Sequence, residues 1–140
     1  MTQILYTPEL ANRALPLVRR IVEDLVRDYT AWRARVQEYE AASAATDDGA
    51  AARTAGLQAE VQRLADAVRD CLAELAALGV ECKGLDVGLV DFPGEIDGEA
   101  ACLCWKLGEP AVAWWHRPDA GFAGRQPLPG AALPAAEASR

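Results

Sequence analysis

The sequence predicts an α+β fold, with a long antiparallel helical hairpin over residues 7–79 and a small three-stranded antiparallel β-meander over residues 80–128. Three observations predict this fold. Apolar residues recur at helical spacing through most of the first half, residues 41–55 interrupt that period, and short β-prone runs separated by glycine begin at Val80. Since the chain has 140 residues, we expect residues 1–128 to form a single domain.

The first predicted helix begins at Thr7-Pro8-Glu9, where a hydroxyl can cap the helix and proline suits its first position. Pro16 removes one backbone hydrogen bond, so we expect a bend near the start of this helix. The apolar residues that recur every three or four positions predict the buried stripe. They are Leu10, Ala14, Leu17, Ile21, Leu25, Tyr29, Trp32, Val36 and Tyr39.

The second predicted helix follows a turn at Thr46-Asp47-Asp48-Gly49. Gly79 is expected to end it, with Val80 folding back on the last turn. Its apolar positions alternate four and three apart, which is a heptad seam. They are Leu57, Val61, Leu64, Val68, Cys71, Leu75 and Leu78. Because one hairpin of this length leaves apolar surface uncovered, we expect the C-terminal half and a second hairpin, paired with the first in a homodimer, to cover it together.

The second half contains three β-prone runs, which predict the three strands of the meander. They read "VECKGLDVGLVDF", "EAACLCWKL" and "AVAWWH". Pro93 restricts the residue before it to extended backbone, and we expect it to end the first strand. The last residues, 129–140, are rich in proline and alanine without a period and are predicted to be disordered.

The charge of the chain excludes two classes of partner. Its formal net charge is −7, and no cluster of lysine and arginine appears. Nucleic-acid binding and membrane-surface binding both need such a cluster, so neither is expected. The start of the chain does not resemble a secretion signal, which predicts a cytoplasmic protein with four reduced cysteines.

One histidine and three carboxylates form the candidate metal site. The ligands we predict are His116, Asp91, Glu109 and Asp119, each near the end of a predicted strand. Histidine with carboxylates is a typical ligand set for iron, manganese or zinc. The register of the last strand is open from the sequence, since His116 pairs with Cys102 in one arrangement and with Ala101 in another.

Residues beside this site are predicted to bind a cofactor or ligand. Trp105, Trp114 and Trp115 would wall a small pocket. Arg125, in "GFAGR", would either present its guanidinium to a small anionic ligand or pair with a nearby acid.

Other functions remain as alternatives to metal binding. The main one is a non-catalytic dimeric scaffold or interaction protein that uses the helical hairpin, with the His/Asp/Arg cluster purely structural. A Cys102 or Cys104 nucleophile activated by His116 and haem ligation by His116 are weaker alternatives. No motif assigns catalytic residues, so whether the protein is an enzyme stays open at this stage.

Four motifs carry a resemblance to a known family. "GLVDFP", "CWKLGE", "WWH" and "GFAGRQP", with the opening "YTPELANRALPLVRRIVEDL", resemble the uncharacterised bacterial family called domain of unknown function 2203. The resemblance covers residues 5–128. It implies a small cytoplasmic protein with a helical hairpin and a small sheet, and it implies no established activity.

Overall fold

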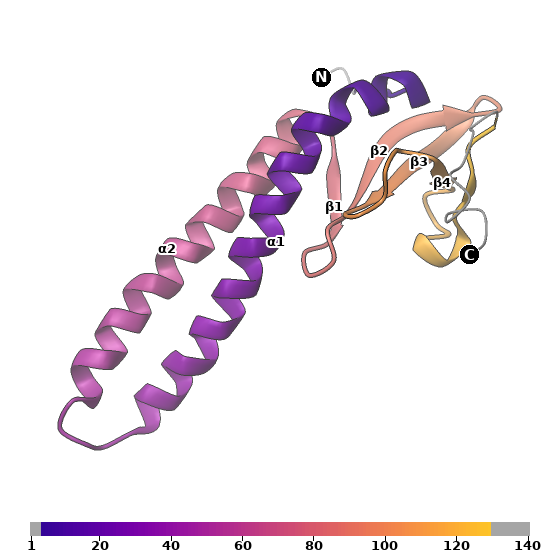
Figure 1. Ribbon diagram of the computed structural model, residues 1–140. Coiled ribbons are helices and arrows are strands. Elements are labelled where there is room, and N and C mark those ends of the chain that lie inside the picture. Colours follow the sequence, from indigo (N-terminus) through magenta and orange to yellow (C-terminus); the bar gives the residue numbers. More distant parts are fainter. Residues whose placement is uncertain (1–3, 130–140) are drawn as a thin grey trace.

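The computed structural model describes residues 4–129 and confirms the predicted helical hairpin followed by an antiparallel sheet (Figure 1). The helices are α1, Pro8–Ala44, and α2, Ala50–Ala77. The strands are β1 Glu81–Gly84, β2 Leu89–Ile96, β3 Glu99–Lys106, β4 Trp114–His116 and β5 Gln126–Pro127, with a 3₁₀ helix, η1, at Phe122–Gly124. The predicted disordered tail, residues 129–140, lies outside the described residues except for Pro129.

The ends of the hairpin form as the sequence predicts. The Thr7 hydroxyl oxygen accepts a hydrogen bond from the Leu10 amide at 3.1 Å, which caps α1. After α2, Gly79 adopts a φ of 77°, and the Val80 amide donates to the Leu75 carbonyl at 2.9 Å. This is the Schellman arrangement, in which glycine tolerates the left-handed backbone conformation.

Pro16 lies inside α1 without ending the helix. The first turns run at an angle to the rest of the helix (Figure 1). This is the expected consequence of a proline ring, which displaces the carbonyl four residues earlier and removes one hydrogen bond. The bend is therefore located where the sequence predicted it.

The sheet has five strands in the order β1-β2-β3-β4-β5, rather than the three predicted. The first predicted run divides into β1 and β2, because a turn at residues 85–88 ends with Gly88 at a φ of 71°. The fifth strand has two residues, one of them Pro127, and such a short strand leaves no period in the sequence.

Pro93 does not end a strand, contrary to the prediction, and β2 continues through it to Ile96. β1 begins at Glu81, which pairs with Asp91, so the part of β2 after Asp91 has no β1 partner. A proline is tolerated there because its missing N–H is not needed for pairing on that side. The Tyr6 amide instead donates to the Pro93 carbonyl at 2.7 Å.

The buried stripe of α1 differs from the predicted one in its first turns. Leu10 and Leu17 are 45% and 51% exposed, whereas Leu15 and Val18 are buried. α1 packs against both α2 and the sheet. In its first turns the residues that face the sheet are therefore buried, instead of the predicted stripe. One hydrophobic cluster includes Leu15, Val18, Val22, Leu75, Val90, Phe92, Leu103 and Trp105.

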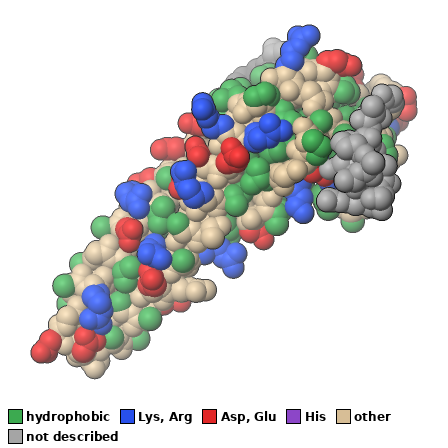
Figure 2. All heavy atoms as spheres, in the orientation of Figure 1, with side chains coloured by type: hydrophobic (Ala, Val, Ile, Leu, Met, Phe, Trp, Pro, Cys, Tyr) green, Lys and Arg blue, Asp and Glu red, His purple; other side chains and the backbone are tan. Residues whose placement is uncertain are grey.

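The hairpin extends well beyond the sheet (Figure 1). Acidic and basic side chains are interleaved along the face shown in Figure 2. Within residues 4–129, neither helix contains an apolar stretch long enough to cross a membrane.

Candidate functional site

Asp91, Cys104 and His116 meet on the face of the sheet opposite the hydrophobic cluster. They lie on β2, β3 and β4, where Asp91 pairs with Cys104 and Cys102 pairs with His116. Alternate residues of a strand share a face, so this register brings all three side chains to one side. All three are buried, with 4%, 0% and 3% of their surface exposed.

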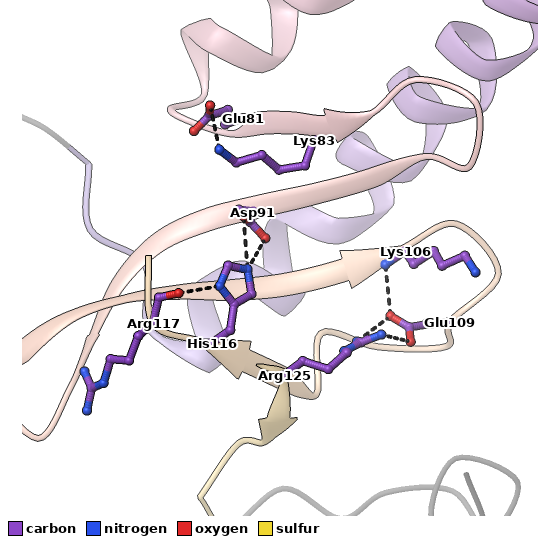
Figure 3. Close-up of polar contacts among 8 residues, drawn as sticks. All are labelled: Glu81, Lys83, Asp91, Lys106, Glu109, His116, Arg117 and Arg125. Atoms are coloured by element: carbon purple, nitrogen blue, oxygen red, sulfur yellow. Dashed lines mark hydrogen bonds and ion pairs between the residues drawn. The ribbon is translucent and has the colours of Figure 1, made fainter. Parts of the chain in front are cut away.

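The hydrogen bonds of His116 define its protonation at one nitrogen. Nδ1 lies 2.7 Å from the Arg117 carbonyl oxygen (Figure 3). A carbonyl only accepts, so Nδ1 carries a hydrogen and donates it. Nε2 then faces the Asp91 carboxylate, 3.1 Å from Oδ1 and 3.2 Å from Oδ2. It either holds a second proton, which makes an ion pair with Asp91, or presents a lone pair.

The geometry of the three side chains suits a metal ion. One ligand atom from each of Asp91, Cys104 and His116 lies within 4.8 Å of the others. Two ligands bound at 2.0 Å to a tetrahedral ion are about 3.3 Å apart, close to the separation of Nε2 from the carboxylate. The Nδ1 hydrogen bond to a backbone carbonyl is also the usual support of a metal-bound histidine.

The surroundings of Cys104 do not activate its thiol as a nucleophile. Burial raises the pKa of its thiol to about 12, the charges of Asp91 and Glu109 act in the same direction, and Arg125 opposes them. Burial also raises the pKa of Cys102. Because a nucleophilic cysteine needs a depressed pKa, these environments do not favour the nucleophile alternative.

Glu109 lies apart from the three-residue cluster and makes a separate salt bridge. Its two carboxylate oxygens accept from the Arg125 guanidinium at 2.8 and 2.9 Å, and Oε1 also accepts from the Lys106 amide at 2.9 Å (Figure 3). Both side chains of the pair are mostly buried, at 8% and 12% exposure. Glu109 therefore has its acceptors occupied by protein groups.

Arg125 takes the second of its two predicted roles, the pairing with a nearby acid. Its guanidinium carbon lies 4.8 Å from the centre of the Trp114 ring and 4.7 Å from that of Phe122. Such cation–π contacts add to the bidentate pairing with Glu109. This arginine is fixed by protein groups on several sides.

The remaining predicted site residues lie elsewhere. Asp119 is exposed in the turn after β4. Trp105 and Trp115 are buried in the hydrophobic cluster, on the other face of the sheet, and the Trp105 indole N–H donates to the Glu109 carbonyl at 2.9 Å. The structure brings together Asp91 and His116 of the predicted metal ligands and adds Cys104, which alternates with Cys102 on β3.

The fold and the site define a small α+β protein in which a helical hairpin carries an antiparallel sheet with a buried histidine–carboxylate–thiol cluster. The chain belongs to the family described as "Uncharacterized conserved protein (DUF2203)", whose model matches residues 4–128. No curated protein and no solved structure matches the chain.

Proposed function

We propose that the protein binds one divalent transition metal ion at Asp91, Cys104 and His116. The orientation of His116 is the observation that carries this proposal. Because Nδ1 donates to the Arg117 carbonyl, Nε2 is the nitrogen left to bind, and it points at a buried carboxylate. A thiol from the adjacent strand completes a set of three different donors.

Zinc is the ion that this donor set favours. Thiolate and imidazole are ligands for zinc and for ferrous iron, whereas manganese prefers oxygen. Zinc sites with three protein ligands keep a fourth position for water or substrate, and structural zinc sites have four protein ligands. The three donors here match the open type of site, so a ligand-binding or catalytic role follows from the proposal.

The competing interpretation is a metal-free ion pair between protonated His116 and Asp91. The same distances of 3.1 and 3.2 Å suit an N–H donor and a carboxylate. In this interpretation the cluster is structural, and the protein is a scaffold. The two interpretations differ in whether the protein binds zinc and is stabilised by it.

Metal analysis of the full chain, purified without a histidine tag, separates them. We expect about one zinc ion per chain, and added zinc should raise the melting temperature of a chelator-treated sample. Asp91→Asn, Cys104→Ser and His116→Gln should each weaken zinc binding at least about tenfold. Cys71→Ser, on α2, is the matched thiol control and should bind as the wild type does.

Two further variants test the predicted ligands that the structure places elsewhere. Glu109→Gln and Asp119→Asn should leave zinc affinity unchanged, because Glu109 is bonded to Arg125 and Asp119 is exposed. A sample that contains no metal and whose melting temperature does not respond to zinc, iron or manganese would overturn the proposal.

We further propose that two copies pair through their hairpins. No side chain of α1 between Leu25 and Ala42 is buried. Two helices bury only the seam between them, and a second hairpin would cover their remaining apolar surface in a four-helix bundle.

Free thiols at all four cysteines suit the reducing cytoplasm, where we propose that the protein resides.

A further inference from the structure

A mostly apolar groove of about 760 Å³ lies between α1 and α2 near the tip of the hairpin. α1 contributes Ala41 and Ala42 to its lining, and α2 contributes Gly56 and Leu57. The sheet lies beside the other end of the hairpin and does not reach this groove (Figure 1). Because three of these four residues are small, the groove allows another helix to approach closely.

Gly56 has no structural reason within the described chain. It lies inside α2, where glycine is less favourable than alanine. A Cβ at this position would meet no atom of the described residues within 4 Å, so no close contact inside residues 4–129 requires a glycine. A helix of another chain that crosses α2 here would explain it, since glycine allows the closest approach of two backbones.

Two opposite charges flank Gly56 and Leu57 on the same face of α2. Arg53 and Glu60 both line the groove. Positions 53, 56, 57 and 60 are three and four residues apart in turn, so their side chains form one stripe along the helix. The stripe therefore reads basic, small, apolar and acidic.

The ion pairs that these charges make within the chain are exposed. Arg53 lies 2.8 Å from Asp47, and Glu60 lies 3.6 Å from an arginine three residues further along α2. Each of the four side chains is at least 45% exposed, and exposed pairs contribute little to stability, so both can change partners at low cost. Glu38, the third charged residue of the groove, is paired with Arg35 at 2.8 Å.

The stripe is complementary to itself when two α2 helices run in opposite directions. With a twofold axis between positions 56 and 57, position 53 of one copy lies opposite position 60 of the other, and 56 lies opposite 57. Each Arg53 then meets a Glu60, and each Leu57 packs over a Gly56. A parallel pair in register would place like charges beside each other, which is repulsive.

We propose that this groove binds the tip of a second copy of the chain, with the two α2 helices antiparallel, Leu57 of each copy against Gly56 of the other, and the charges at 53 and 60 paired between copies. The inference rests on the proposed pairing of hairpins and adds the face, the direction and the register. It places the two sheets at opposite ends of the dimer.

Exchange of charges tests the register. Arg53→Glu and Glu60→Arg should each raise the dimer dissociation constant of the full-length chain at least about tenfold in sedimentation equilibrium, because like charges then face each other twice. An equal mixture of the two variants should pair about as tightly as the wild type, since each glutamate again faces an arginine. Arg69→Glu is the matched control. Arg69 is an exposed arginine of α2 outside the groove, 3.0 Å from Asp66, and its variant should pair as the wild type does.

Gly56→Leu tests the close contact between the helices. Within one chain it should keep or raise the helix content in circular dichroism, because leucine favours a helix and the space is open. It should still weaken pairing at least about tenfold, because the new side chain fills the place of Leu57 from the second copy. Ala73→Leu, at an exposed position of α2 away from the groove, is the matched control.

The outcomes separate this inference from the pairing on which it rests. A wild-type chain that stays single at all concentrations overturns both. A dimer that none of Arg53→Glu, Glu60→Arg and Gly56→Leu weakens overturns only the arrangement at the tip. Charge variants that weaken pairing alone and do not pair when mixed overturn the antiparallel register.

Discussion

At the scale of single residues, the sequence predicted two of the three polar side chains that the structure brings together in the buried cluster, Asp91 and His116. Asp91 and His116 were predicted together because an acid and the only histidine lie near strand ends. Cys104 was not among the predicted site residues, because its proximity to Asp91 depends on the pairing of β2 with β3, and a shift of one residue would point it to the other face. Glu109 was assigned to the metal since its partner, Arg125, is 16 residues away in the chain.

The Glu109–Arg125 pair gives a prediction at this scale. Glu109→Gln should lower the free energy of unfolding by about 3 kcal/mol, because the Arg125 guanidinium would be left buried without its counter-charge. Urea denaturation measures the loss. The double variant Glu109→Gln/Arg125→Met should recover part of it. A single variant as stable as the wild type would show that the pair does not have this structural role.

At the scale of elements, the helices were predictable and the sheet was only partly so. Capping and helical period are local signals, so the bounds near residues 8, 49 and 79 follow from the sequence. The strands depend on distant pairing, and the short β5 and the continuation of β2 through Pro93 leave little local trace. The face of α1 at Leu10 and Leu17 was misassigned because the direction of the sheet, which the sequence does not specify, decides which stripe is buried.

The turn between β1 and β2 gives a prediction at this scale. A Cβ on Gly88 would lie 2.8 Å from Leu107 Cβ and 2.8 Å from Val22 Cγ1, and the φ there is +71°. Gly88→Ala should therefore lower the free energy of unfolding by about 3 kcal/mol or more, from backbone strain and from displaced packing against α1.

Gly98→Ala is the matched control for the Gly88 variant. Its φ is +78°, but a Cβ would meet nothing within 4 Å. It should lose only about 1 kcal/mol, the strain of the left-handed conformation. Equal losses for the two variants in urea denaturation would contradict the close packing of this turn against α1.

At the scale of the whole molecule, the sheet rests beside one end of a hairpin whose other end extends beyond it (Figure 1). This division places the candidate site and the candidate pairing surface in different parts of the chain. The metal site would therefore persist in variants that disturb pairing, which allows each proposal to be tested without the other.

The pairing of hairpins gives a prediction at this scale. Light scattering after size exclusion should give twice the chain mass of 15.0 kDa. Leu57→Glu, in the heptad seam of the distal part of α2, should shift the mass toward one chain, because a buried charge disfavours the bundle. Leu17→Glu, at a position 51% exposed in the monomer, is the control. A single-chain mass for the wild type at all concentrations would contradict the proposal.

The most direct measurement of the central claim is the X-ray absorption spectrum at the zinc edge of the zinc-loaded protein. The three proposed ligands predict one sulfur at about 2.3 Å and two or three nitrogen or oxygen atoms at about 2.0–2.1 Å. Cys104→Ser should remove the sulfur, and Cys71→Ser should leave it. A zinc ion without sulfur, or with two sulfur ligands, would contradict the assignment of the ion to Asp91, Cys104 and His116.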